Sequence, residues 1–94
     1  MEFVKVPGEK RKHKVLMYAI STCVWCKLTK SFLKEQNVEY EYVDVDLIGP
    51  EEREKVKRHI LEMGGRLSYP AIIIDDELII NGFRKDKLTE VLEL

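Results

Sequence analysis

The order of elements can be predicted outward from residues 15–26, which read Val15-Leu16-Met17-Tyr18-Ala19-Ile20-Ser21-Thr22-Cys23-Val24-Trp25-Cys26. The first six residues form an uninterrupted apolar run, which is typical of a central strand covered on both faces. Ser21 and Thr22 then supply hydroxyl groups suited to the start of a helix. A helical pattern of apolar residues follows and ends at Asn37, a residue that commonly terminates helices. This stretch therefore predicts a strand, a short turn and a helix.

The rest of the chain continues the same alternation of strands and helices. The expected elements are a strand over 38–45, a helix over 50–63, strands over 71–74 and 78–80 that form a hairpin, and a closing helix around 88–92. The resulting order is β-α-β-α-β-β-α. It predicts an α/β fold with a central four-stranded mixed sheet and helices on both faces.

The length and composition fit one folded domain. The chain has 94 residues, of which 45% are hydrophobic, enough for a packed core. We predict a single domain over residues 1–94, with residues 1–13 as an N-terminal extension. Within that extension, Phe3-Val4-Lys5-Val6 is either an edge strand or a loose segment, and the pattern leaves both open.

The charge pattern argues against a nucleic acid or a membrane as partner. The net charge is −1, so the chain has no overall attraction to either. The basic run at residues 10–14 has no interleaved aromatic residues and is interpreted as a solvated segment that leads into a strand. No apolar run approaches the roughly 20 residues that span a bilayer, and no signal region is visible at the N-terminus. We therefore expect a soluble cytoplasmic protein.

Two cysteines, Cys23 and Cys26, lie at the junction of the first expected helix with the strand before it. Because they are three residues apart, their side chains share one helix face and can close a small disulfide ring with little backbone motion. Unpaired N–H groups at the helix start favour an anion on Cys23, and the thiolate is the nucleophilic form of cysteine. We predict Cys23 as the catalytic nucleophile and Cys26 as the resolving cysteine.

The cysteines have two other interpretations. A lone cysteine is often a small buried hydrophobic residue, but the spacing and position of this pair favour redox chemistry. Half of a zinc site would need two more ligands, and the only histidines, His13 and His59, lack the spacing of a zinc-binding pair. We therefore predict no metal site and no cofactor, and interpret His59 as a helix-surface residue.

Three motifs give the chain a resemblance to glutaredoxins and, more closely, to the glutaredoxin-like redoxins that reduce ribonucleotide reductase. They are a C-V-x-C segment at Cys23-Val24-Trp25-Cys26, a proline position at Tyr69-Pro70, and a segment similar to G-F-R-P-D at Gly82-Phe83-Arg84-Lys85-Asp86. The residues around Pro70 alone would leave an ordinary trans peptide bond as the expectation. The resemblance, which covers nearly the whole chain, implies a thioredoxin-like fold and a cis bond at Pro70.

The resemblance also implies a binding groove beside the cysteines. In that family the backbone of the residue before the cis-proline pairs with a bound peptide or with glutathione. Carried over, Tyr69 would present its N–H and C=O to the extended chain of a partner, beside Pro70. Gly82 and Phe83 would form the opposite wall. Trp25 is a candidate contact for the substrate, although an inward-packed position for it is left open.

Several departures from the glutaredoxin pattern weaken dependence on glutathione. Glutaredoxins usually have a lysine three residues before the nucleophile, where this chain has Ile20. Their Gly-Gly-x-x-Asp motif is replaced here by the segment 81–86. Val24 and Trp25 occupy positions that usually hold proline and tyrosine. Trp25 and Tyr69 also differ from the usual residues of the ribonucleotide-reductase redoxins.

Our leading hypothesis is a monomeric dithiol electron carrier that reduces protein disulfides, with those of ribonucleotide reductase as a candidate substrate. Its electrons would come from a thioredoxin-reductase-like or a ferredoxin-linked reductase. The alternatives are a glutathione-dependent glutaredoxin, an iron–sulfur-binding module in which Cys23 from two chains holds a cluster, and a thioredoxin-fold scaffold with inactive cysteines.

Overall fold

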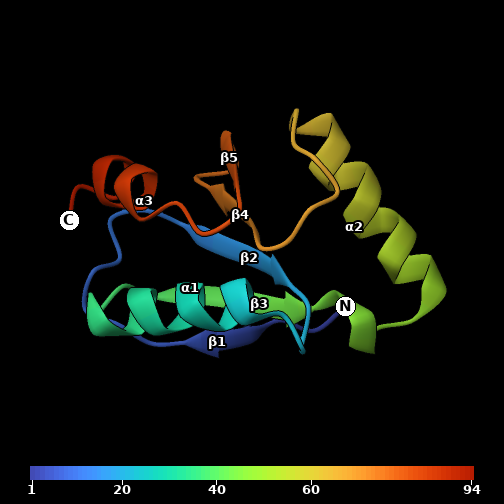
Figure 1. Ribbon diagram of the computed structural model, residues 1–94, viewed down its shortest axis with the longest axis horizontal. Coiled ribbons are helices and arrows are strands. Elements are labelled where there is room, and N and C mark those ends of the chain that lie inside the picture. The colour runs from blue at the N-terminus through green and yellow to red at the C-terminus, as the bar shows by residue number, and fades with distance from the viewer.

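A five-stranded mixed sheet in the order β1-β3-β2-β4-β5 forms the centre of the computed structural model, which describes all 94 residues (Figure 1). The strands are β1 (Val4–Val6), β2 (Val15–Ala19), β3 (Tyr40–Asp44), β4 (Ala71–Ile74) and β5 (Leu78–Asn81). Strands β2 and β3 are parallel and every other pair is antiparallel. The α/β class and the mixed sheet are confirmed.

The predicted number of strands was one too low. Residues Val4–Val6 form the edge strand β1, which pairs antiparallel with β3 so that Val4 faces Tyr42 and Val6 faces Tyr40. The edge-strand alternative for the N-terminal extension is therefore the one observed. Val6 packs against the core beneath α1, which gives this short strand an apolar anchor.

Helices cover both faces of the sheet, as predicted. They are α1 (Val24–Glu35), α2 (Pro50–Glu62) and α3 (Lys85–Val91), and a short 3-10 helix, η1 (Val45–Leu47), follows β3. Figure 1 shows α1 over β3, α3 at the upper left and α2 on the right, apart from the other two helices. None of the helices is long and apolar enough to cross a membrane.

The two cores explain why the apolar run of β2 is uninterrupted. Val15, Met17 and Ala19 contribute to a core shared with α1 and α3, whereas Leu16 and Tyr18 contribute to a second core shared with α2. Since successive side chains of a strand point to opposite faces, both faces of β2 must be apolar. The whole strand is buried.

The helix ends agree with their sequence signals, with one correction. Asn37, just past α1, has φ 59°, and Pro50 is the first residue of α2. The cap of α1, however, is Cys23 rather than Ser21 or Thr22. The hydroxyl of Ser21 instead donates to the Asp46 carboxylate, which ties the loop after β2 to η1.

The interpretation of His59 as an ordinary surface residue of α2 was wrong. Its Nδ1 lies 2.7 Å from the hydroxyl oxygen of Tyr18, and the two rings meet edge to face at 5.7 Å. Tyr18 is buried in the middle of the sheet, so its hydroxyl group needs a polar partner. His59 provides that partner at the interface between α2 and the sheet.

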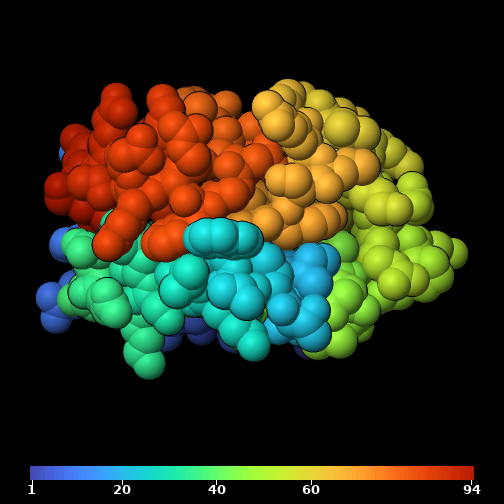
Figure 2. All heavy atoms as spheres, viewed as in Figure 1, coloured from blue at the N-terminus to red at the C-terminus, as the bar shows by residue number.

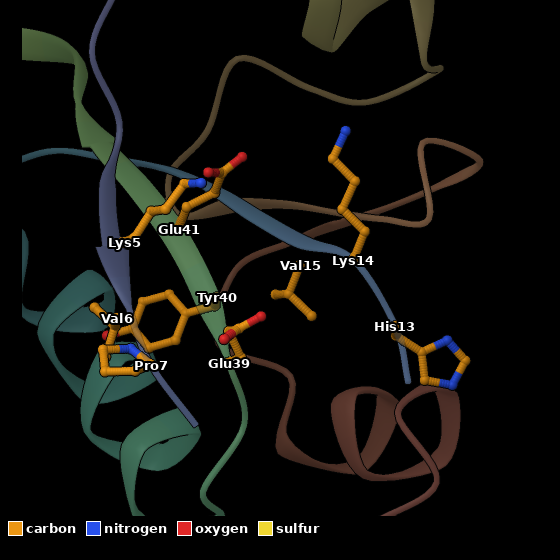
Figure 3. Close-up of a pocket in the computed structure, with 9 residues that line it drawn as sticks. All are labelled: Lys5, Val6, Pro7, His13, Lys14, Val15, Glu39, Tyr40 and Glu41. Carbon is orange, nitrogen blue, oxygen red and sulfur yellow. The ribbon is translucent and has the colours of Figure 1, made fainter. Parts of the chain in front are cut away.

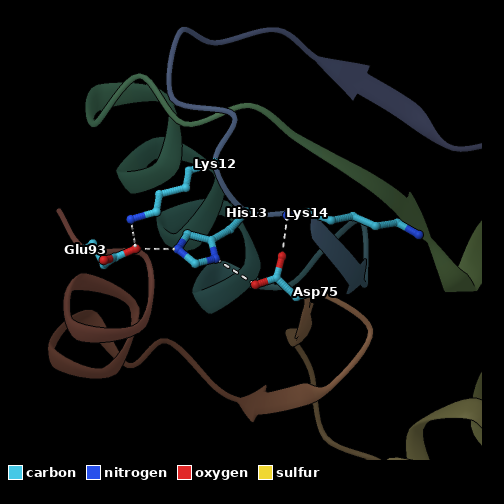
Figure 4. A network of polar contacts seen from close by, with 5 residues as sticks. All are labelled: Lys12, His13, Lys14, Asp75 and Glu93. Atoms are coloured by element: carbon cyan, nitrogen blue, oxygen red, sulfur yellow. Dashed lines mark hydrogen bonds and ion pairs between the residues drawn. The ribbon is translucent and has the colours of Figure 1, made fainter.

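The basic segment before β2 is bound to acidic residues from two other parts of the chain (Figure 4). His13 lies between two carboxylates, with Nδ1 2.7 Å from Asp75 and Nε2 2.8 Å from Glu93. Lys12 pairs with the same Glu93 oxygen at 2.7 Å, and the backbone N–H of Lys14 donates to Asp75. These contacts fasten the segment to the β4–β5 turn and to the C-terminus.

This network predicts a pH-dependent contribution of His13 to stability. Hydrogen bonds to Asp75 and Glu93 raise the pKa of His13. The contact with His13 lowers the pKa of Asp75, and contacts with Lys12 and then with His13 lower the pKa of Glu93. The contribution is therefore full where the carboxylates are ionised and His13 is protonated, and it is lost as the pH rises through the raised pKa of His13. We expect His13→Gln to lower the urea midpoint at pH ~5.5 and to have a smaller effect at pH ~8.5. An equal loss at both pH values would contradict this account.

Candidate active site

Both cysteines lie at the N-terminus of α1, and their sulfur atoms differ sharply in exposure. Cys23 is the N-cap residue and is partly exposed, whereas Cys26, in the first turn, is 0% exposed. The backbone N–H of Cys26 donates to the sulfur of Cys23 at 3.2 Å. A thiolate at Cys23 would therefore receive a hydrogen bond at the positive end of the helix dipole.

The loop between β2 and α1 sets the positions of both sulfur atoms. The C=O of Ile20 accepts the N–H of Cys23 at 3.1 Å, and the N–H of Ile20 points to the sulfur of Cys26 at 3.5 Å. The Ser21 backbone is held in turn by Asp46, whose carboxylate accepts its N–H at 2.9 Å. The cysteines thus follow directly after a fully buried strand, and hydrogen bonds fix the loop that joins them to it.

Burial raises the pKa of Cys26 to about 12, and the neighbouring Cys23 acts in the same direction. The positive charge of Lys30, one turn further along α1, acts against this rise. Lys30 is held by an ion pair with Asp44 at 3.3 Å and lies over the ring of Tyr42 at 3.9 Å. Cys26 is therefore a protonated thiol near neutral pH.

We expect the two thiols to differ in alkylation under native conditions. A thiol with a pKa of about 12 is ionised in about one molecule in 10⁵ at pH 7, and Cys26 is also closed to reagent. Iodoacetamide should therefore modify Cys23 alone, as read by peptide mass mapping, and both residues in urea. Modification of Cys26 in the folded protein at the rate of Cys23 would refute this assignment.

The residues around the Tyr69–Pro70 bond and after β5 lie beside the cysteines. The Tyr69–Pro70 peptide bond is cis, and the C=O of Tyr69 lies 3.9 Å from the sulfur of Cys23. The C=O of Pro70 accepts the N–H of Gly82 at 2.8 Å, and Gly82 has φ +86°. Phe83 is partly exposed and packs against Phe32 of α1, with 6.0 Å between the ring centres. The residues that the resemblance brings to the site thus meet there, while their roles in binding stay predictions.

Trp25 is the most prominent apolar side chain beside the cysteines. It is 60% exposed, so the inward-packed alternative does not apply. Val24 and Leu28 are also exposed on the same end of α1. In Figure 2 the cyan surface of this end of α1 adjoins the orange surface after β5 and the yellow-orange surface that precedes β4. The cysteines therefore have an apolar rim available to a partner.

Asn81, which no sequence motif marked as a site residue, holds the loop before the cis bond. Asn81 accepts the backbone N–H of Arg66 through Oδ1 and donates through Nδ2 to the C=O groups of Arg66 and Ser68, each at 2.9 Å. A Cβ atom at Gly65 would lie 3.1 Å from this Oδ1 and 2.5 Å from the side chain of Ile79. The glycine therefore leaves space for the amide of Asn81.

We expect Asn81→Ala to loosen this loop. Three hydrogen bonds are lost and three backbone groups must find water, at a cost of about 1–3 kcal/mol in the free energy of unfolding. Urea unfolding should show this loss, and the KM for a protein disulfide should rise more than kcat falls. Gln36→Ala, at an amide side chain with no such contacts, is the matched control. A variant as stable as the parent would contradict the role of Asn81.

The hollow at the start of β2 and β3 is separate from the cysteines. It has a volume of about 470 Å³ and is lined by residues of β1, β2 and β3 and by the segments beside them (Figure 3). Lys5 and Lys14 on its walls are matched by Glu39 and Glu41, so it presents no consistent charge. No group of three or more His, Cys, Asp or Glu side chains is arranged to hold a metal ion.

Comparisons with known proteins show which family the chain resembles in sequence. The family model described as Glutaredoxin matches residues 15–79. Over 64 residues the chain is 36% identical to Glutaredoxin 1 of Rickettsia conorii; the match covers 68% of this chain and spans 60% of that relative's length. It is 32% identical to a glutaredoxin-like 8.6 kDa protein in the rubredoxin operon of Clostridium pasteurianum, covering 84% of this chain and 97% of the other.

A solved structure with a similar fold is the glutaredoxin from Methanosarcina mazei Go1. It superposes with a TM-score of 0.89 and 37% sequence identity, and the match covers 98% of this chain and 88% of the other. The predicted thioredoxin-like fold is therefore confirmed, and the chain shares it with a protein of known structure.

Proposed function

The chain belongs to the glutaredoxin family, whose members are thiol–disulfide oxidoreductases, and from this premise we propose that it is a dithiol carrier that reduces protein disulfides through Cys23 and Cys26. The observation that carries the proposal is the asymmetry of the pair. Cys23 is reachable and lies at a helix N-terminus, whereas Cys26 is buried and holds its proton.

The reaction follows from that asymmetry in two exchanges. The Cys23 thiolate, whose proton has gone to solvent, attacks a substrate disulfide, breaks its S–S bond and releases one substrate thiolate. Cys26 transfers its proton to that thiolate and attacks the sulfur of Cys23. The mixed disulfide then breaks, and the second substrate thiolate leaves and takes a proton from solvent. Two electrons pass to the substrate, and the chain is left with a Cys23–Cys26 disulfide.

The walls around the cysteines suit an extended protein segment as substrate. Trp25, with Val24 and Leu28, offers an apolar surface on one side, and Phe83 offers another across the groove. In our proposal the backbone of Tyr69 pairs with the segment that carries the disulfide, beside Pro70 and Gly82. The resemblance to the ribonucleotide-reductase redoxins makes the disulfides of that enzyme the first candidate substrate.

We infer that a reductase protein, rather than glutathione, supplies the electrons. Position 20 holds isoleucine in place of the lysine expected in a glutathione site. The backbone of Ile20 contacts the cysteines through hydrogen bonds to Cys23 and Cys26. We place the protein in the cytoplasm, as a monomer without a cofactor. Its upstream partner would be a thioredoxin-reductase-like or a ferredoxin-linked enzyme.

The test offers the oxidised protein separately to glutathione, to an NADPH-linked thioredoxin reductase and to a ferredoxin-linked reductase. Thiol formation is then measured, with insulin reduction as the coupled readout. We expect one of the two reductases to restore the dithiol and to sustain insulin reduction. Rapid reduction by glutathione alone would favour a glutathione-dependent glutaredoxin. No insulin reduction by the chemically reduced protein would overturn the proposal.

A further inference from the structure

A second hollow, also of about 470 Å³, runs along the exposed edge of the sheet beside the candidate active site. Its walls are formed by β5, by the loop before β4 and by the start of α3. We call it the basic groove, because Arg66, Arg84 and Lys87 line it and no acidic side chain does. Its volume is in the range of sites that bind small ligands or short peptide segments.

The positive charge of the basic groove is only partly neutralised within the chain. Neither Arg66 nor Lys87 forms an ion pair, and Arg84 makes only a long contact of 3.6 Å with Asp86. All three side chains are exposed. Unpaired cations also occur elsewhere on the surface, but the hollow at the start of β2 and β3 has glutamates beside its lysines, whereas the basic groove has no acidic side chain in its walls. The basic groove is thus a hollow lined by three cations and by no acidic side chain.

The basic groove is continuous with the wall that faces Cys23. Ser68, in the groove, immediately precedes Tyr69, whose C=O lies 3.9 Å from the sulfur of Cys23. Asn81, also in the groove, binds the C=O of Ser68 and immediately precedes Gly82. An extended chain advances about 3.3 Å per residue, so a segment paired with Tyr69 reaches the groove within a few residues.

We propose that the basic groove binds acidic side chains of the substrate protein, close in sequence to the cysteine that Cys23 attacks. This inference rests on the proposed function and names its substrate class as disulfides with acidic residues nearby. Carboxylates complement the guanidinium groups of Arg66 and Arg84 and the ammonium group of Lys87. Because the groove is open to solvent, its effect should be sensitive to salt.

The test uses two peptides that differ only in charge. Each contains one cysteine in a mixed disulfide with a chromophoric thiol, flanked on both sides by glutamates in one peptide and by glutamines in the other. We expect the wild-type protein to reduce the glutamate peptide with a kcat/KM about tenfold higher at low ionic strength, and this preference should shrink in high salt. Removing two cations with Arg66→Gln and Lys87→Gln should remove most of the preference.

A matched control changes the net charge equally at a distance from the basic groove. Lys55→Gln with Arg58→Gln removes two exposed cations from α2, and the preference should persist in this variant. Equal rates for both peptides in the wild type, or equal loss in the two double variants, would overturn the docking proposal and leave the proposed function intact. If neither peptide is reduced, the proposed function fails and the docking proposal fails with it.

Discussion

Cys23→Ser is expected to lower the rate of protein-disulfide reduction by about 10³-fold or more, because a serine hydroxyl is not an effective nucleophile toward a disulfide sulfur near neutral pH. Cys26 cannot replace it, since it is fully buried and burial raises its pKa to about 12. The measurement is insulin reduction with dithiothreitol as donor, corrected for the rate with the donor alone.

The fold itself should survive this substitution. Cys23 is the N-cap of α1, and its side chain accepts the backbone N–H of Cys26. Serine is among the preferred residues at this position, so the urea midpoint of Cys23→Ser should equal or exceed that of the parent. If insulin reduction is lost while the urea midpoint is unchanged, the defect lies in the missing nucleophile and not in the fold. Insulin reduction near the parent rate would refute Cys23 as the nucleophile.

The order of elements was predictable because each long element carries its own periodic signal. The apolar run of β2 and the caps at Asn37 and Pro50 are local features that need no knowledge of the rest of the chain. Strand β1 was not decidable for the opposite reason. It has three residues, the first two are exposed, and its place depends on pairing with β3.

Parts of the site were hidden from the sequence because their partners are distant along the chain. Asn81 binds backbone groups 13 and 15 residues away, and Tyr18 meets His59 across 41 residues. The basic groove likewise collects Arg66, Arg84 and Lys87 from two segments that are distant along the chain. The cysteine pair, in contrast, was predictable from sequence because both redox residues lie within four consecutive positions.

Cys26→Ser should stop the reaction after the first exchange and leave a covalent complex between Cys23 and the substrate. Attack by Cys23 needs no group on Cys26 except its backbone N–H, which the substitution keeps. The second exchange loses its nucleophile, so turnover with insulin should stop when no other thiol resolves the complex, and should fall on the order of 10–10²-fold when dithiothreitol resolves it slowly. Non-reducing electrophoresis and intact-mass measurement should show the adduct.

The substituted side chain lies in a place where serine is tolerated at a modest cost. The N–H of Ile20 points to the sulfur of Cys26 and offers the new hydroxyl group a hydrogen-bond partner, so the loss of stability should be about 1–3 kcal/mol. The control is the double variant Cys23→Ser, Cys26→Ser, which should trap no substrate.

A Cys26→Ser protein that turns over insulin at the parent rate without added thiol would show that Cys26 does not resolve the complex. If the rate recovers only when glutathione is present, glutathione performs the second exchange in that variant. We expect the parent chain to perform this step internally, because Cys26 lies one helical turn after Cys23 in α1.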